Sequence, residues 1–483
     1  MNQIVNFNIV FKVISRNLFI LTGALLSCLG VAVIFTEPLM PFIWTSAISL
    51  SLGLFMHFST HSQIEDAAVT KKEAYLTVSL SWALISLVGS LPYLFSQAIP
   101  SFVNALFESV SGFTTTGASI LTEIESLPKS ILFWRSMTHW VGGIGIIVLV
   151  VIVMPTLQIG GYNLFTLESS LQDKIRPRIR SVGHRLLLIY LVLTLSEIIL
   201  LLLGDMNLFD SVCHAFGTVA TGGFSPRNTS IAEYSPYIQY VIMVFMLLAG
   251  TNFIVFYYLY KLDFKKALNN EELRFYLKII LFVGLIITAG LFFQTDRSLE
   301  QSFRESFFQL ISIVTCTGFA TADYLQWPTF LWIIIFLSMF LGGCTGSTAG
   351  GIKMARHLLL LKNFKKILTN LLHPNAIIPI RLNKNTLNDS TNNSIMTFIT
   401  VYGIIFILGT ILMVASGLDG ETASSSVATC MAGIGPGIGT VGPASNFAHL
   451  SLPGKSILTF LMIIGRLEIY TVIMLFTPEF WRN

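Results

Sequence analysis

The chain has 483 residues, of which 53% are hydrophobic and only 11% charged, and its mean hydropathy is +0.74. This composition indicates a polytopic membrane protein and excludes the soluble domains that the length alone would suggest. The net charge is +4, and the five cysteines contain no CxxC pair. Buried free thiols are therefore expected, rather than a disulfide framework or a metal site.

Two apolar runs predict transmembrane helices at the start of the chain, over 17–36 and 38–60. No small-residue cleavage site follows the first run, so we interpret it as a span and not as a secretory signal. After a polar loop, the uncharged run 74–107 is too long for one helix. Prolines divide it into a span, a turn and a short helix that continues into the polar stretch 107–119. A further span is predicted over 132–154.

The same order of elements then recurs three times. In the second copy, a span from 185 to about 204, a short helix over 208–219 and the sequence ATGGFS precede a span over 234–260. In the third, a span over 277–293, a short helix over 301–314 and TCTGFATAD precede a span from 327 that GGCTGSTAGGIK interrupts. In the fourth, a span within 390–418, a short helix over 422–432 and GIGPGIG precede a span over 455–477.

These repeats predict an all-α polytopic membrane protein with ten transmembrane helices and four half-length ones. Two extra helices occupy 1–70, and the four repeats of span, pore helix and span occupy 71–160, 161–270, 271–385 and 386–483. Each repeat has an even number of spans, so the four copies are related by a pseudo-fourfold axis along the membrane normal. Most of the 29 Lys and Arg residues fall on one side, including those of 174–185 and 353–384, which places this side and both termini in the cytoplasm.

Four loops align by the residue that ends each short helix. The aligned residues are Thr115, Thr116 and Gly117; Thr221, Gly222 and Gly223; Cys316, Thr317 and Gly318; and Gly433, Ile434 and Gly435. Glycine permits the backbone that turns successive carbonyls toward an axis, and rings of carbonyl oxygens can replace the hydration shell of a monovalent cation. Any one such loop is more often a simple turn. Four in register, each between two spans, predict a pore.

These motifs resemble the Trk/Ktr/HKT superfamily of potassium transporters, specifically membrane subunits of the TrkH/TrkG type. The resemblance covers nearly the whole chain and includes TTTGA at 114–118, GGF at 222–224, CTGFATAD at 316–323, GPGIG at 435–439 and GGCTGSTAGGIK at 342–353. It implies potassium uptake across the bacterial inner membrane through a gated, K⁺-selective pore, with K⁺ at the twelve aligned residues. Gly433 stands where related sequences tend to carry Asn, so the ligands of the fourth loop stay open.

The same resemblance has implications for partners and cofactors. It implies a homodimer in the lipid bilayer, gated by a TrkA-type cytoplasmic ring that binds the regulatory nucleotide. It implies no enzymatic activity, no organic cofactor in this chain and no nucleic-acid partner.

Two further features concern gating. The second expected span of the third repeat is interrupted by a stretch that includes Gly342, Gly343, Gly346, Ser347, Thr348, Gly350, Gly351 and Lys353. One interpretation is a packing kink that lets helices approach closely. The other, which the resemblance supports, is a flexible intramembrane loop that blocks the pore beneath the filter. Arg466 lies within the last apolar run, either paired with Glu468 or Glu197, or lining the pore as a barrier to cations.

Two rival functions stay open at this point. A symporter that moves K⁺ with H⁺ or Na⁺ could use the same fold, although Glu197 and Glu468 are the only obvious candidates for a buried proton relay. A membrane receptor or scaffold that does not transport ions could use the basic loops, but it would not need four filter-like loops.

Overall fold

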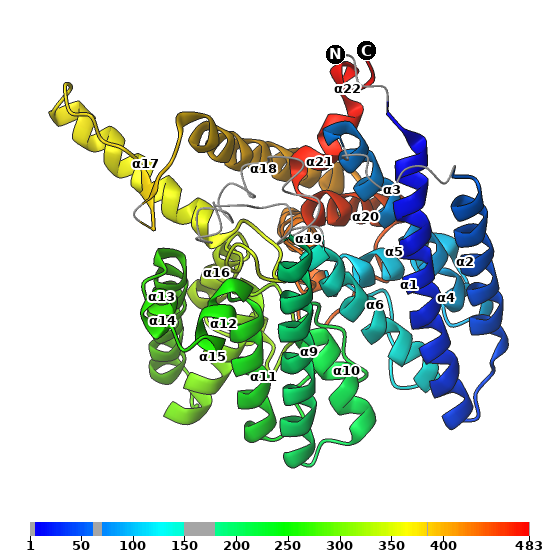
Figure 1. The fold of residues 1–483 in the computed structure, drawn as a ribbon. Helices are drawn as coiled ribbons and strands as arrows, with labels where there is room; N and C mark the ends of the chain where they lie inside the picture. The colour runs from blue at the N-terminus through cyan, green and yellow to red at the C-terminus, as the bar shows by residue number, and fades with distance from the viewer. Residues whose placement is uncertain (1–4, 61–69, 149–178, 384, 483) are drawn as a thin grey trace.

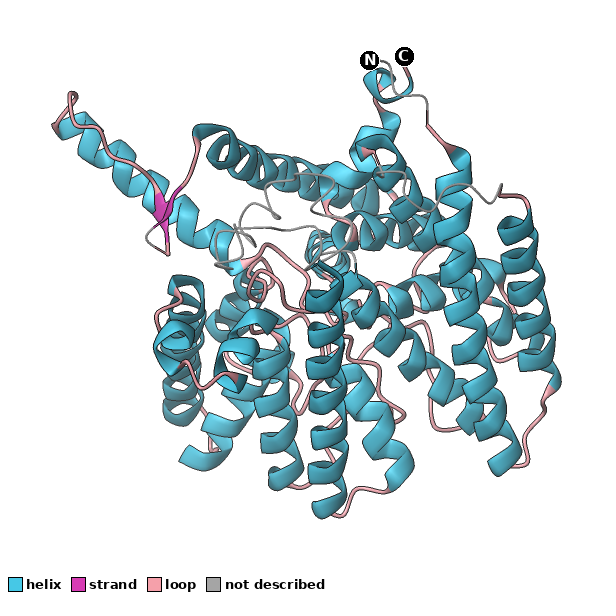
Figure 2. Ribbon diagram, in the orientation of Figure 1, coloured by secondary structure: helices cyan, strands magenta, loops and turns pink. Residues whose placement is uncertain are grey.

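The computed structural model describes residues 5–60, 70–148, 179–383 and 385–482. Helices form most of this part of the chain, and a single two-stranded hairpin accompanies α17 (Figure 2). The two ends of the chain lie close together on one side of the molecule (Figure 1). There the ammonium group of Lys72 donates to the carbonyl oxygen of Arg482 over 2.9 Å.

The two leading helices, α1 (Phe7–Ile34) and α2 (Met40–Phe58), pack against each other along their length. Their buried hydroxyls meet at Thr22 and Ser49, which are 3.0 Å apart. The connection between them also supports the first repeat. The Glu37 carboxylate accepts the backbone N–H groups of Lys129 and Ser130 over 2.6 and 2.8 Å, and so caps the start of α6.

The four repeats follow in order. The first comprises α3 (Lys71–Gly89), α4 (Leu91–Phe95), α5 (Phe102–Phe113) and α6 (Lys129–Val148). The second comprises α9 (Ile179–Leu203), α10 (Leu208–Val219), α11 (Pro236–Ala249), α12 (Phe253–Tyr260) and α13 (Phe264–Leu268). The third comprises α14 (Glu271–Gln294), α15 (Leu299–Val314), η2 (Tyr324–Gln326), α16 (Thr329–Ser338), α17 (Met354–Leu372), β1 (Arg381–Leu382) and β2 (Asn385–Thr386). The fourth comprises α18 (Asp389–Ala415), α19 (Gly420–Ala432), η3 (Gly439–Val441), α20 (Leu452–Arg466), α21 (Ile469–Ile473), η4 (Met474–Phe476) and α22 (Pro478–Trp481).

This order confirms the predicted architecture of two leading helices and four repeats. The four short helices are α5, α10, α15 and α19, each of 12 to 16 residues. The residue numbers at which we divided the repeats stay a prediction. The end of the span expected over 132–154, and the basic residues Lys174, Arg176 and Arg178, lie outside the described residues.

The described residues contain six helices that are long and apolar enough to cross a membrane, and eight if each of two bent pairs counts as one span. The remaining two of the ten predicted spans correspond to α6, which reaches the edge of the described part, and to α16, an apolar helix of ten residues. We therefore treat the chain as a multi-pass membrane protein.

Two spans that we predicted as continuous are broken. Helices α11 and α12 meet at 97°, and α20 and the segment 469–476 meet at 114°. At the first break, the carbonyl oxygen of Gly250 accepts the N–H of Cys344 over 2.8 Å, so a neighbouring segment occupies the gap. At the second break, Glu468 has a φ of 64°, which no helix tolerates. Hydropathy could not reveal either break, because both sides remain apolar.

Candidate functional site

The four short helices end in loops that share one backbone conformation. Each loop contains a residue in the left-handed region just after its helix: Thr115, Thr221, Cys316 and Gly433, with φ of 51°, 55°, 57° and 72°. Two residues later, each contains a glycine with positive φ: Gly117, Gly223, Gly318 and Gly435, with φ of 79°, 80°, 82° and 96°. Four different sequences therefore adopt the same path, as the alignment of the loops predicted.

The left-handed conformation also explains the departure at the fourth loop. Gly433 occupies the position that Thr115, Thr221 and Cys316 occupy elsewhere, and glycine adopts a φ of 72° without the strain that those side chains bear.

The four glycines pack against one another's loops in a closed ring. A Cβ atom at Gly117 would lie 2.2 Å from the carbonyl oxygen of Gly222, and one at Gly223 would lie 2.0 Å from that of Thr317. A Cβ atom at Gly318 would lie 1.9 Å from the carbonyl oxygen of Ile434, and one at Gly435 would lie 2.9 Å from that of Thr116. Each loop therefore touches the next, and the fourth returns to the first. No side chain fits at three of these positions without displacing a backbone carbonyl.

A cavity of about 180 Å³ opens on one side of this ring. Gly117, Gly223, Gly318 and Gly435 all line it, together with the loops that lead away from the four short helices. The sequence therefore brings its four aligned glycines to one place, as expected.

Hydroxyl groups distinguish alternate loops. In the first loop the Thr114 and Thr116 hydroxyl oxygens are 2.8 Å apart, and in the third those of Thr315 and Thr317 are also 2.8 Å apart. The second and fourth loops have Ala220 and Ala432 where the first hydroxyl would be. The fourfold relation is thus a property of the backbone, and the side chains follow it only approximately.

A buried ion pair supports the first loop from behind. The Arg135 Nε lies 2.9 Å from the Glu108 carboxylate, and both side chains are nearly inaccessible to solvent. The carboxylate also accepts the Ser119 hydroxyl and the Ile120 N–H, which directly follow the filter-like sequence. Arg135 donates in turn to the carbonyl oxygen of Ser225, over 3.1 Å. One charged pair therefore fixes the exits of the first and second loops.

Aromatic contacts extend this support to the second loop. The ring of His139 stacks on Phe224 at a centroid distance of 4.1 Å, and its Nδ1 accepts the Phe224 N–H over 3.3 Å. The Arg135 guanidinium also lies over the Phe224 ring, 4.2 Å from its centroid. Phe224 follows Gly223 directly, so these contacts hold the backbone of the ring.

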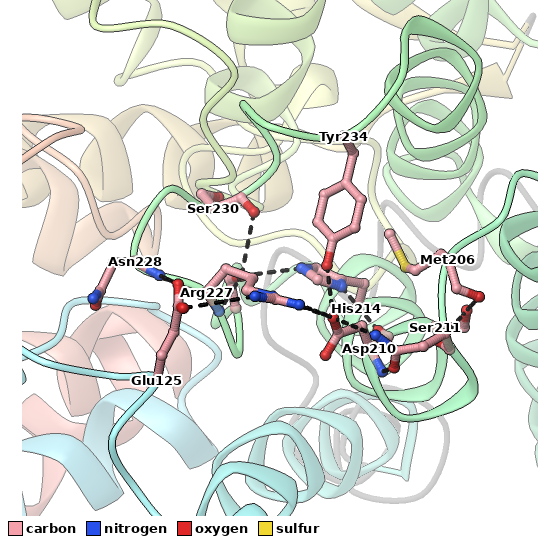
Figure 3. Close-up of polar contacts among 11 residues, drawn as sticks. Glu125, Met206, Asp210, Ser211, His214, Arg227, Asn228, Ser230 and Tyr234 are labelled. Carbon is pink, nitrogen blue, oxygen red and sulfur yellow. Dashed lines mark hydrogen bonds and ion pairs between the residues drawn. The ribbon is translucent and has the colours of Figure 1, made fainter.

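A second polar network joins the outer ends of the first two repeats (Figure 3). Arg227 lies between Asp210, at 3.2 Å, and Glu125, at 3.6 Å, and the Tyr234 hydroxyl donates to Asp210 over 2.9 Å. His214 places Nδ1 2.8 Å from the Asp210 carbonyl oxygen and Nε2 3.0 Å from the Ser225 hydroxyl. A carbonyl oxygen only accepts, so Nδ1 donates and the neutral ring accepts the Ser225 hydroxyl at Nε2.

The glycine-rich interruption in the third repeat, residues 342–353, lies on the other side of the ring. We call it the intramembrane loop. The Thr348 hydroxyl contacts the carbonyl oxygens of Val219 and Ala249 at 3.0 and 3.3 Å, and the Phe253 N–H donates to Gly346. A Cβ atom at Gly350 would lie 2.1 Å from the carbonyl oxygen of Ala432.

The other predicted residues of the intramembrane loop fold it upon itself. Ile352 bridges to Leu341 beside Gly342, the Ser347 hydroxyl donates to Cys344, and the Lys353 ammonium group donates to Ala349. Gly346 and Gly351 have φ of 77° and 68°, and Gly343 packs against the Ala349 side chain. The loop thus contacts the ends of α10 and α19 as well as the break between α11 and α12.

Arg466 lies at the end of α20, where the last span breaks, and is buried. Its guanidinium donates to the carbonyl oxygens of Thr348, over 2.9 Å, and Gly142, over 3.2 Å. Neither suggested carboxylate pairs with it: Glu468 binds Arg356 at 2.6 Å, and Glu197 has no partner in the described chain. Arg466 is therefore held against the intramembrane loop by backbone oxygens, and no carboxylate among the described residues forms an ion pair with it.

Several of these supporting residues were missed at the level of the sequence. Glu108 lies inside a short helix, and Arg135 and His139 lie inside an apolar span. An ionisable side chain within a membrane segment was the signal that could have identified them. His139 and His214 are packed inside the protein, and each also holds the second loop through a hydrogen bond.

Four short helices around one ring of backbone oxygens, inside a bundle of apolar helices, are typical of a membrane protein that transports ions. A model of the TrkH family, described as a cation transport protein, matches residues 39–482. The chain belongs to this family.

Individual relatives are similar over nearly the full length. The Trk system potassium uptake protein TrkH of Salmonella typhimurium is 38% identical over 450 residues, which cover 92% of each chain. The TrkG protein of Escherichia coli is 36% identical over 418 residues, 85% of this chain and 86% of its own. The crystal structure of the potassium transporter TrkH from Vibrio parahaemolyticus superposes with a TM-score of 0.90 at 32% identity and covers 99% of this chain and 100% of that one.

We expect Gly318→Ala to destabilise the ring. Its Cβ would meet the Ile434 carbonyl oxygen at 1.9 Å, and its φ of 82° disfavours any side chain. A loss of about 1–3 kcal/mol in the free energy of unfolding is expected. The measurement is the thermal midpoint of the protein in detergent. Gly403→Ala is the matched control, because no atom lies within 4 Å of its Cβ position in α18. Equal midpoints for the two variants would contradict the ring contact.

Proposed function

We propose that this chain takes up potassium across the bacterial inner membrane, as the pore-forming membrane subunit of a Trk system. The observation that carries the proposal is the closed ring, in which each of four aligned glycines faces a backbone carbonyl oxygen of the next loop. Carbonyl oxygens replace the hydration shell of a monovalent cation without adding a fixed charge that would retain a divalent one. The related proteins of Salmonella typhimurium and Escherichia coli are named for potassium uptake, which agrees with this ion.

The filter in this proposal consists of the twelve aligned residues at 115–117, 221–223, 316–318 and 433–435. The short helices point their carboxy-terminal ends at the ring, and the partial negative charge there favours a cation. In each loop, two residues with positive φ flank one residue without it. This shared pattern turns successive carbonyl groups the same way in all four loops. K⁺ is the transported ion, and this chain needs no organic cofactor for that role.

The gate in this proposal is the intramembrane loop with Arg466. The loop contacts the lower ends of α10 and α19, beneath the ring, and Arg466 fixes its Thr348. A buried cation next to the path raises the energy of a second cation that passes it. The glycines of the loop can absorb the backbone change that opening requires.

Partners and orientation follow from the resemblance and from charge. We infer a homodimer with both termini in the cytoplasm, regulated by a TrkA-type ring that carries the nucleotide. The basic side that includes Arg185, Lys353 and Arg482 supports this orientation. A non-transporting receptor has no such support, because it requires no ring of carbonyl oxygens.

Expression of this chain, with a regulatory partner, should restore growth at limiting K⁺ to a bacterium that lacks potassium uptake. Gly117→Ser should reduce the discrimination between K⁺ and Na⁺, because its Cβ would lie 2.2 Å from the Gly222 carbonyl oxygen and displace it. Growth rate and the uptake ratio of the two ions are the measurements. An unchanged ratio would refute our assignment of the filter, and a failure of the unaltered chain to rescue growth would count against transport.

Arg466→Ala should raise the cation flux through the purified protein in liposomes by roughly ten-fold. At an effective dielectric constant of about 20, a nearby unit charge adds about 1–2 kcal/mol to the barrier. Lys365→Ala is a suitable control, because that side chain is exposed on α17, outside the ring. A flux that stays the same or falls would be inconsistent with a barrier at Arg466.

One observation favours symport of K⁺ with H⁺ as a second candidate. Glu197 of α9 is fully buried, and neither of its carboxylate oxygens has a hydrogen-bond partner in the described chain. Intramembrane carboxyl groups of this kind often mark proton pathways. Glu468, the other candidate, is occupied by Arg356.

The reversal potential separates the two mechanisms. For a channel, we expect it to follow the K⁺ gradient and to be insensitive to an imposed pH gradient. For a symporter, the reversal potential would shift toward the proton equilibrium potential when a pH gradient is imposed. Glu197→Gln would abolish that shift if coupling passes through this residue. A pH-dependent shift in the unaltered protein would therefore favour the second candidate.

A further inference from the structure

Glu272, on the first turn of α14, is fully buried next to the intramembrane loop. Its Oε1 accepts three hydrogen bonds: from the Thr345 N–H at 2.7 Å, the Thr345 hydroxyl at 3.1 Å and the Ala355 N–H at 2.8 Å. Thr345 precedes Gly346, and Ala355 follows Lys353 and Met354. A single oxygen atom therefore joins the two ends of the segment that lies beneath the ring.

The start of α17 depends on this oxygen. Lys353 occupies the N-cap position, and its side chain makes no capping hydrogen bond. The first N–H groups of a helix have no partner within the helix, and a negative charge there is favourable. Glu272 supplies both the acceptor and the charge from a different helix, and α14 and α17 pack against each other.

The cost of placing this carboxylate here is not offset by a cation. The ion pairs among the described residues do not include Glu272, and its Oε2 has no hydrogen-bond partner there. Burial of a carboxylate is expensive unless hydrogen bonds compensate for it, and an apolar residue would fill the space at lower cost. The three bonds to the loop are the compensation that the structure provides. Packing alone therefore does not explain a glutamate at this position.

We propose that Glu272 is a positioning residue that holds the intramembrane loop closed across the conduction path. The inference rests on the gate proposed above. While Thr345 and Ala355 share one acceptor, they cannot separate, so the loop residues between them move only within a fixed span. Release of the Thr345 and Ala355 amides from Glu272 frees the loop to leave its contacts with Val219 and Arg466.

Glu271 provides a matched control. It lies on the same turn of α14 and carries the same charge, and among the described residues no hydrogen bond or ion pair joins its side chain to the intramembrane loop. Its carboxylate binds Lys362, and its N–H donates to the Asn383 side chain over 2.8 Å, beside the β1–β2 hairpin. Loss of this partly exposed carboxylate removes a charge from the same turn without removing an acceptor from Thr345 or Ala355.

Hydrogen exchange of the full-length protein in detergent tests the anchor directly. In Glu272→Ala, the amides of Thr345 and Ala355 should exchange about ten-fold faster or more, because each loses a bond to a charged acceptor. Glu272→Gln keeps a carbonyl acceptor and should stay near the unaltered protein, as should Glu271→Ala. Size-exclusion profiles identify any variant that does not fold. Unchanged exchange in Glu272→Ala, or equal acceleration in Glu271→Ala, would overturn the proposal.

K⁺ flux in liposomes separates this inference from the proposed function. Glu272→Ala should raise the flux several-fold, and Glu272→Gln should not. If the unaltered protein conducts and Arg466→Ala raises the flux while Glu272→Ala does not, the positioning role is wrong and the proposed function stands. Absence of flux in every protein would instead contradict the proposed function, and the exchange rates would still decide whether Glu272 anchors the loop.

Discussion

The contact between a glycine and the carbonyl oxygen of the next loop is the constraint on which the rest of the structure depends. Each of the four loops leaves a space the size of a methyl group, and a neighbouring backbone fills it. Backbone at this depth in a membrane is tolerated only where protein buries it or where it lines a path. The left-handed residues on either side of each loop's central position satisfy this requirement by turning the chain sharply at the ring.

Buried charged and polar side chains hold this strained backbone in place, and they do so unequally. Glu108 and Arg135 brace the first two loops, and His139 and His214 brace the second. On the opposite side of the ring, Arg466 and Glu272 hold the intramembrane loop through backbone groups. An isolated charge in such surroundings is expensive, and Glu108, Arg135, Arg466 and Glu272 are each bonded to main-chain groups.

The sequence was sufficient to predict the four repeats, the short helices and the convergence of Gly117, Gly223, Gly318 and Gly435, because hydropathy and internal repetition are local signals. It was not sufficient for the breaks at Gly250 and Glu468, which depend on a segment from another repeat. The role of Glu272 could not be predicted from the sequence for the same reason. Its partners, Thr345 and Ala355, are distant in the chain, and a glutamate at the start of a helix is ordinarily a surface residue that favours the helix dipole.

The closure of the ring also bears on the order in which the protein is made. Gly435 meets Thr116, and the Phe447 N–H donates to Ser119 over 2.8 Å, so the last repeat completes contacts with the first. Domains of a chain generally fold as they emerge from the ribosome, and contacts between distant segments form late. Part of the backbone of the first loop therefore stays uncovered until nearly all of the chain has been inserted. A chain that ends before the fourth repeat would retain many of its helices but could not assemble the ring.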